Sequence, residues 1–332
     1  MCLINKYMDS LIVDGRSEDT ITAYKTDLLD FQEFMINMLG KNNQLDVLKS
    51  VKLKHINEYK RYLASYKKNR KDIAGLSPTS INRKIASLKG FYRYLEDMEF
   101  IESDPTSRVK NVRVEDEVTY VLTDENLGKI IDEIDNEYID ANTLTRRYFA
   151  IRNKLMVILS GVYGLRAEEV NNLKLDNIID NTLWLYKTKG GKNRQLTIND
   201  VDMKILNEYL NVRDEFIVNY KLPIEDNTIL FMSKSRNTVC PIDKNGKTSS
   251  KPLNEMLRKY IVRIEDLKND VDQIHWHSLR HTAITSLISQ NYSIPVVSKF
   301  AGHSTPVVTL NIYTHITNDS VKEMCLSMNR TK

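Results

Sequence analysis

The chain has 332 residues, of which 41% are hydrophobic and 28% charged, a composition typical of a globular protein with room for two domains. No apolar run approaches the roughly 18 residues of a membrane-spanning helix, and residues 1–6 lack the basic and apolar regions of a signal peptide. We therefore expect a cytoplasmic protein without a membrane partner. Its three widely separated cysteines, Cys2, Cys240 and Cys325, are expected to be reduced thiols.

The formal net charge of +4 is weak evidence for a nucleic-acid partner, but the charge is unevenly distributed. Between Lys49 and Arg93 there are 13 Lys and Arg residues against two acids, Glu58 and Asp72. A stretch of this kind fits either a solvated surface or a surface that binds nucleic acid. The charge pattern by itself leaves both interpretations open.

Residues 1–105 are predicted to form an all-helical domain. Ser17 is a natural N-cap for the first periodic run, a second run starts at Leu53, and Ser77-Pro78 opens a third with proline at the first helical position. The third helix has an apolar stripe and a basic side. That basic side carries Arg83, Lys84 and Lys89. The aperiodic, charged residues 106–118 are predicted to be a linker to a second domain, 119–332.

The second domain is predicted to be mixed. Helices are expected from an N-capped start at 122–125 and over 152–162, 167–173 and 201–220, and again from 251 to the end. Residues 183–188 and 193–198 are strand-like and flank Lys189-Gly-Gly-Lys192, a hairpin turn. The irregular stretch 231–250 is interpreted as an insertion that forms a second hairpin. A lysine beside a glycine turn is often only a solvated loop tip, so Lys189 carries little weight alone.

The segment from His275 to His315 carries the most distinctive chemistry. His277 and Arg280 precede Gly302-His303, and Thr305-Pro306 then begins a short helix that leads to Tyr313. A phenol, with a pKa of about 10, is a poor nucleophile unless cations and hydrogen-bond donors stabilise the charge that its attack creates. Arginine and histidine side chains gathered around a tyrosine suit attack on a phosphodiester.

A zinc site is the competing interpretation, because His275, His277 and His281 are close in sequence. These histidines alternate with Trp276 and Arg280 and do not form one helical face with further ligands. The pattern therefore favours phosphodiester chemistry, with no metal and no cofactor.

Five motifs in this order resemble the tyrosine recombinase (phage integrase) family, and specifically its Xer-like or small mobile-element integrases. They are Gly-Leu-Arg166-x-x-Glu169, Thr-Lys189-Gly-Gly-Lys-x-Arg, His277-x-x-Arg280-His, Gly302-His303-Ser and Ile312-Tyr313-Thr-His. The resemblance covers nearly the whole chain, since 20–27 and 78–95 look like the family's core-binding domain. Trp276 and Ala301 depart from the usual proline and leucine, away from any reacting position.

The resemblance implies a mainly α fold with a small β-hairpin, in which a helical core-binding domain and a mixed α/β catalytic domain form a C-shaped DNA clamp. The implied partner is a double-stranded recombination site, bound by a tetramer that spans two such sites. Arg83, Lys84 and Lys89 are expected to face the DNA. The apolar stripe of the tail at Val321, Met324, Cys325 and Met328 is expected to dock on a neighbouring protomer.

The resemblance also implies roles for individual residues. Arg166 and Arg280 would bind the non-bridging oxygens of the scissile phosphate, and His277 and His303 would add donors and handle the tyrosyl proton. Lys189 would protonate the leaving 5′-oxygen, and Tyr313 would form a 3′-phosphotyrosyl link. Glu169 would orient its neighbours.

Two other functions use the same features. A type IB topoisomerase shares the chemistry but relaxes DNA as a monomer, whereas recombination requires several protomers. A catalytically inactive DNA-binding protein would share the fold, although all six reacting positions are present in this sequence. Site-specific recombination is the function that the sequence favours.

Overall fold

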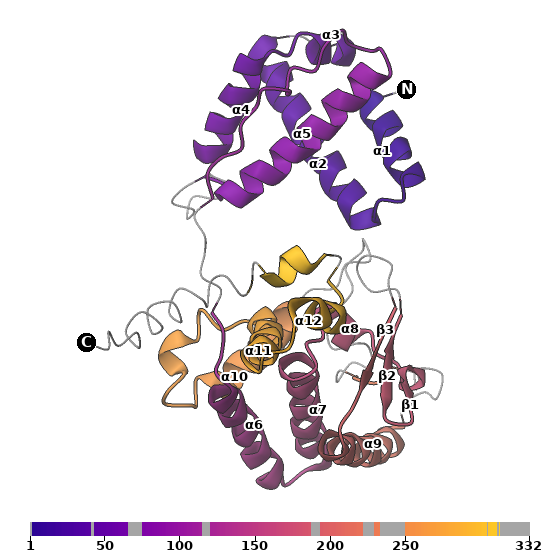
Figure 1. Cartoon of the computed structure of the whole chain (residues 1–332), viewed down its shortest axis with the longest axis vertical. Coiled ribbons are helices and arrows are strands. Elements are labelled where there is room, and N and C mark those ends of the chain that lie inside the picture. The colour runs from indigo at the N-terminus through magenta and orange to yellow at the C-terminus, as the bar shows by residue number, and fades with distance from the viewer. Residues whose placement is uncertain are drawn as a thin grey trace, which may run out of the picture. The chain divides into compact units, whose positions relative to one another are not determined.

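The computed structural model describes residues 2–40, 43–65, 75–114, 120–186, 193–221, 229–232, 250–303, 305–310 and 312. Contacts divide the chain into two compact units, Met1–Glu117 and Val118–Lys332, each with its own hydrophobic core (Figure 1). The described parts of both units are mainly helical, and the second unit holds one small sheet. The predicted fold class, mainly α with a small β element, is confirmed. None of the described helices is long and apolar enough to cross a membrane.

The described part of the first unit is helical. Its helices are α1 (Leu3–Val13), α2 (Glu18–Leu39), α3 (Gln44–Lys49), α4 (Leu53–Ser65) and α5 (Pro78–Asp97). The predicted caps are confirmed, because the Ser17 side chain accepts a hydrogen bond from the Thr20 amide and Ser77 accepts one from that of Ser80. Helices α1 and α3 were not predicted. The first has no side-chain N-cap, and the second, although Asn43 caps it, is only six residues long and too short for a helical periodicity to show.

The basic residues of α5 do not all lie at the surface. Lys84 is 7% exposed, and its ammonium group contacts Asp27 at 3.0 Å and Asp30 at 2.7 Å. Asp27 is itself buried and also pairs with Arg83, which stays half exposed. The sequence-based placement of Lys84 on an exposed basic side is therefore wrong, because helical periodicity does not reveal a carboxylate on a neighbouring helix. Lys89 is half-buried, with its ammonium 3.4 Å from the Asn111 side-chain oxygen.

The fold of the first unit continues past Pro105 into the segment predicted as a linker. Val109 is buried in the core of this unit. The Asn82 side chain donates to the Val112 carbonyl at 2.8 Å and accepts from its amide at 2.7 Å. Residues 106–112 are thus fixed to α5. Residues 115–119 lie outside the described part of the chain.

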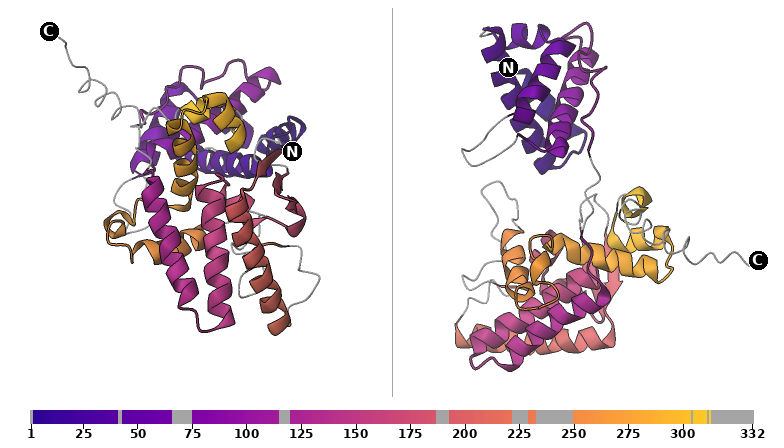
Figure 2. Two further views of the ribbon diagram at one scale, coloured as in Figure 1. Left: turned by 60° about the horizontal axis from the view of Figure 1, so that its bottom comes forward. Right: turned by 90° about the vertical axis from the view of Figure 1, so that its left-hand side faces the viewer.

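In the second unit, α7 (Leu144–Gly161) lies between α6 (Asp124–Ile139) and α9 (Asp200–Asn219) and contacts both (Figures 1 and 2). Helix α11 (Trp276–Ser289) also packs on α7. Further helical elements among the described residues are α8 (Ala167–Asn171), α10 (Lys251–Ile261), α12 (Ile294–Ala301), two 3-10 turns, Leu175–Asn177 and Lys268–Asp270, and the helical segment 306–310. Helix α7 begins earlier than the predicted residue 152, and Thr143 caps it. The charged residues Arg146 and Arg147 interrupt the apolar periodicity of this first turn, so the sequence does not indicate it.

The sheet has three antiparallel strands in the order β1 (Ile178–Ile179), β2 (Thr182–Leu185) and β3 (Arg194–Thr197). Leu183 faces Leu196 in the register, and both are buried. The predicted hairpin pairing of β2 and β3 is confirmed, while the two-residue β1 was not predicted. The turn 187–192 and the insertion 233–249 fall outside the residues that the structure describes.

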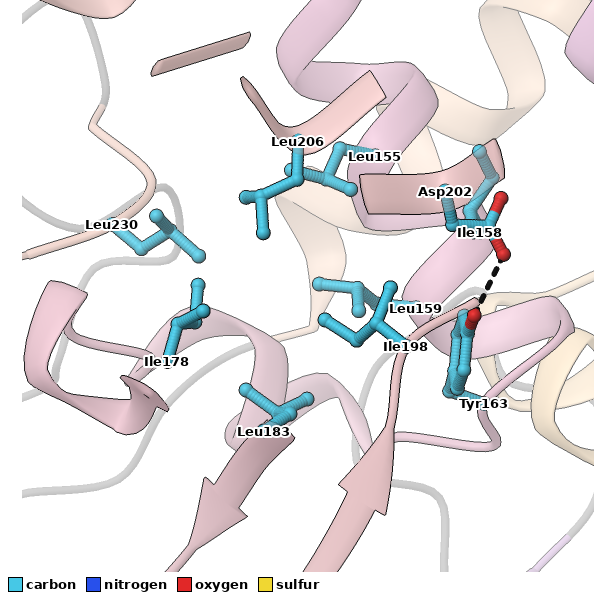
Figure 3. A pocket seen from close by; sticks show the side chains of 10 residues that line it. All are labelled: Leu155, Ile158, Leu159, Tyr163, Ile178, Leu183, Ile198, Asp202, Leu206 and Leu230. Atoms are coloured by element: carbon cyan, nitrogen blue, oxygen red, sulfur yellow. Dashed lines mark hydrogen bonds between the residues drawn. The ribbon is translucent and has the colours of Figure 1, made fainter. Parts of the chain in front are cut away.

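The hairpin is seated on the helices by apolar contacts. Leu183 and Ile198 face Leu159 of α7 and Leu206 of α9 around a gap of only about 10 Å³ (Figure 3). A gap this small is a packing defect of the core, at the lower limit for one water molecule. Its edge carries Tyr163, whose position matters for the site described below.

We predict that Lys84→Ala lowers the free energy of unfolding of the first unit by about 3 kcal/mol. This is the low end for breaking a buried ion pair, because Arg83 remains beside Asp27. Urea unfolding measures the change, with Lys89→Ala as the matched control on the same helix. Equal, small losses for both variants would show that the Asp27–Lys84 pair contributes little.

Candidate active site

Arg166 is positioned by a break between α7 and α8. Helix α7 ends at Gly161, and Gly164 then adopts a left-handed conformation with φ of 66°. Tyr163 fixes this break to the start of α9, because its hydroxyl donates to Asp202 at 2.7 Å and accepts from the Asn199 amide at 3.0 Å (Figure 3). Arg166 then stands at the N-cap of α8. The chain therefore enters α8 in one fixed orientation.

The carboxylate of Glu169 binds two arginines. Its Oε1 accepts from Nη1 of Arg166 at 2.9 Å and from Nη1 of Arg194 at 2.8 Å. Its Oε2 accepts from the Arg166 amide and from Nη2 of Arg194, both at 2.8 Å. Burial alone would raise the pKa of Glu169, but the hydrogen bonds and charge of Arg194, with those of Arg166, lower it. The carboxylate is therefore ionised at neutral pH, which agrees with an orienting role.

The arginines also donate hydrogen bonds to backbone carbonyls. Each of these carbonyls belongs to a left-handed glycine or to the residue beside one. Arg280 is 2% exposed and donates to the carbonyls of Gly164 and of Ala301, the latter at 2.5 Å. Arg166 donates from Nη2 to the carbonyl of Gly302 at 3.0 Å. Burial and the charge of Arg166 lower the pKa of Arg280 to about 9, so it stays charged at neutral pH. Two guanidinium groups are thus fixed in one small region.

Three histidines adjoin these arginines. The ring of His277 lies edge-on to that of His281, with centroids 4.5 Å apart. His303 follows the end of α12, and its Nδ1 lies 2.7 Å from the hydroxyl of Thr309, a fully buried residue of the helical segment 306–310. Thr309 therefore fixes the orientation of the His303 ring.

The histidines are neutral in the free protein at neutral pH. Desolvation, followed by the charges of Arg280 and Arg166, lowers the pKa of His277, although its ring is exposed at the surface of the site. Desolvation and the same two arginines lower the pKa of His303 to about 4. For His281, desolvation and the neighbouring His277 lower the pKa to about 4. Arg166, Arg194 and Arg280 against one carboxylate then leave a surplus of two positive charges.

The structure brings together four of the six predicted catalytic residues, Arg166, His277, Arg280 and His303. They come from the start of α8, from α11 and from the end of α12. Lys189 and Tyr313 lie outside the described residues. Within the described chain, no group of three or more His, Cys, Asp or Glu side chains is arranged to hold a metal ion.

Three further residues at the site were assigned no catalytic role by the sequence analysis. They are Arg194, Thr309 and His281. Arg194 ends the motif around Lys189 and His281 follows Arg280, so both stood inside recognised motifs. No periodicity or spacing indicates that the Arg194 side chain would reach Glu169 from another element. Thr309 carried no signal, because a threonine in a short helix is common.

The geometry matches an anion site built from arginines, and comparison with known proteins shows the family of the chain. Residues 120–319 match the phage integrase family, and residues 4–99 match the phage integrase N-terminal SAM-like domain. The chain belongs to the phage integrase family. It is a tyrosine-type site-specific DNA recombinase. A tyrosine recombinase of Thermosipho africanus is 28% identical over 97% of this chain and 99% of its own length.

Solved structures share the fold of this recombinase. The Tn1549 transposon integrase in complex with circular intermediate DNA covers 98% of this chain and 99% of its own, with a TM-score of 0.64 at 19% identity. A lambda integrase tetramer bound to a Holliday junction covers 93% of this chain and 76% of its own, with a TM-score of 0.60 at 13% identity.

We predict that the recombinase loses stability as the pH falls from about 6.5 to about 4. Over this range the unfolded histidines bind protons that His281 and His303 in the folded protein do not, so the unfolded state is favoured. The loss should be less steep in His281→Gln than in the unchanged protein. Thermal unfolding midpoints measured across this range test the prediction, with pH 7 as the reference for each protein. Parallel curves for the two proteins would contradict it.

Proposed function

We propose that Tyr313 is the nucleophile of this recombinase. Its phenolic oxygen attacks the scissile phosphorus, the bond from phosphorus to the 5′-oxygen breaks, and a 3′-phosphotyrosyl link and a free 5′-hydroxyl result. Attack of a 5′-hydroxyl on that link rejoins the strand and releases the tyrosine. Each step exchanges one phosphoester for another, so no external energy source is needed.

The observation that carries this proposal is the fixed pair of arginines, Arg166 and Arg280. Each guanidinium is held by backbone carbonyls and keeps its charge, in a region with surplus positive charge. The rigid fork of an arginine matches the geometry of phosphate oxygens. Donors that are already in place stabilise the charge that develops on the non-bridging oxygens without reorganising during the reaction.

The histidines supply proton transfer and a further donor. Thr309 engages Nδ1 of His303, which leaves Nε2 as the nitrogen to donate to the phosphate in this proposal. Neutral His277, exposed at the surface of the site, accepts the proton of Tyr313 as the phenol attacks. Lys189 is proposed as the general acid for the 5′-oxygen, on the strength of its motif alone.

We further propose that the first unit, like the second, binds the DNA. The match to the SAM-like domain supports a DNA-binding first unit. Arg83 and Lys89 remain candidates for backbone contacts, since neither is buried, whereas the charge of Lys84 is compensated by two carboxylates. Neutralising Arg83 and Lys89 together should flatten the dependence of DNA binding on salt concentration, and an unchanged slope would exclude them.

Recombination rather than relaxation is supported by the match to a relative that is named a tyrosine recombinase. The match extends over almost the whole length of both chains. The lambda integrase structure is a tetramer on a Holliday junction, which supports a tetramer on two sites for this chain as well. Cleavage by successive protomers within such an assembly exchanges strands between the two sites.

We predict that Tyr313→Phe abolishes the covalent complex with DNA while leaving binding nearly unchanged, because one hydroxyl adds little to a footprint made of many phosphate contacts. The site is first obtained by capturing covalent complexes from nicked duplexes with randomised cores. Single-turnover cleavage of the selected duplex, run on a denaturing gel, gives the result. Arg166→Ala and Arg280→Ala should still form the adduct, about 10²- to 10³-fold more slowly. An adduct that persists in Tyr313→Phe would disprove the assignment.

We also propose that the tail 314–332 docks on a neighbouring protomer through its apolar stripe. The tail lies outside the described residues; the short helix predicted for it from the sequence would be marginal alone and would bury that stripe against a partner surface. Truncation after Asn318 is predicted to leave binding to a single half-site intact and to prevent assembly of the active multimer. Native gels and a recombination assay measure the two steps. Normal strand exchange by the truncated chain would show that the tail packs elsewhere or is dispensable.

A further inference from the structure

The side chain of Arg194 is held by contacts with residues of the site. Its side chain is 6% exposed and forms a two-pronged ion pair with Glu169 across two 2.8 Å hydrogen bonds. It also passes directly over Gly302, where an added Cβ would come within 2.5 Å of its Nη1. Gly302 thus provides the space that this side chain occupies. The guanidinium joins the first residue of β3 to the start of α8 and to the end of α12.

The charge arrangement shows what Arg194 does for Arg166. A carboxylate has about four acceptor positions, and Glu169 uses two for Arg166 and two for Arg194. With Arg194 absent, Arg166 alone would form the ion pair with the negatively charged Glu169. The pair would then be neutral, and the guanidinium would be drawn toward Glu169 and away from a substrate. With Arg194 present, the three groups together carry one positive charge.

We propose that Arg194 is a positioning residue for the cleavage reaction, which acts through Glu169 to keep the charge and orientation of Arg166 available to the scissile phosphate. This inference rests on the function proposed above. Arg194 itself does not touch the reacting atoms. Its electrostatic effect reaches further into the site, since it contributes to the lowered pKa of His303.

The test compares two substrates in single-turnover cleavage of the selected nicked duplex. One carries the ordinary scissile phosphate, and the other a methylphosphonate, in which a neutral methyl group replaces one charged non-bridging oxygen. Arg194→Ala should slow cleavage of the phosphate about 10- to 100-fold, as loss of an outer group that holds a reacting ligand does. The slowing should be only a few-fold on the methylphosphonate, because this substrate carries less negative charge on its non-bridging oxygens for Arg166 to stabilise.

Controls separate this role from loss of structure. Arg213 is another arginine of the same unit with a buried side chain, which donates to the carbonyls of Ile229 and Leu230. Arg213→Ala should reduce cleavage of both substrates by the same factor. Arg194→Lys should recover part of the rate, because lysine keeps the charge and loses the two-pronged geometry. In a Glu169→Gln background, Arg194→Ala should cost less than it does alone, because there is no carboxylate charge left to offset.

Three outcomes would overturn the proposal. They are an equal loss on both substrates, no loss at all, or rescue of Arg194→Ala by a 5′-thio leaving group. Rescue by the 5′-thio leaving group is expected of Lys189→Ala, since a thiolate leaves without a proton. The same rescue of Arg194→Ala would mean that Arg194 acts in protonation of the leaving group, as proposed for the lysine. A covalent adduct in Tyr313→Phe would instead refute the proposed function, so the two failures are distinguishable.

Discussion

The arrangement of the site depends on one buried carboxylate. Three guanidinium groups in one small region repel one another, and each pays a cost for leaving water. Glu169 offsets this cost for Arg166 and Arg194 with four hydrogen bonds, while Arg280 relies on backbone carbonyls. The result is a site whose positive charge is stabilised but only partly neutralised. In the proposed mechanism, the scissile phosphodiester supplies the missing negative charge when it binds.

The carbonyls that complete this site require particular backbone conformations. Gly164 and Gly302 both have a positive φ, which side chains other than glycine rarely adopt. At Gly164 the left-handed turn directs the carbonyl to Arg280, and at Gly302 it leaves room for Arg194 as well. Tyr163 holds the first of these turns to α9. A few hydrogen bonds therefore connect the arginines to the hydrophobic core of the second unit and restrict their movement.

Charge in the first unit has a different use. Arg83, Lys84 and Lys89 were expected to face the DNA, yet Lys84 points at Asp27 and Asp30 and stabilises the contact of α5 with α2. Counting basic residues overestimates the positive surface wherever an acidic residue of another helix lies opposite. Arg83 and Lys89 are the members of the predicted set that keep an accessible side chain.

The sequence by itself determined the helical character of the first unit, the hairpin, and the motifs with their order along the chain. These features depend on local periodicity, caps and residue types, which are readable without contacts. The family's motifs likewise indicated Arg166, His277, Arg280 and His303 before any geometry was known. Tertiary structure alone decided that Arg194 reaches Glu169, that Thr309 holds His303, and that Lys84 is buried. Each of these pairs joins residues of different elements, and such pairing depends on how helices and strands pack, which no local pattern encodes.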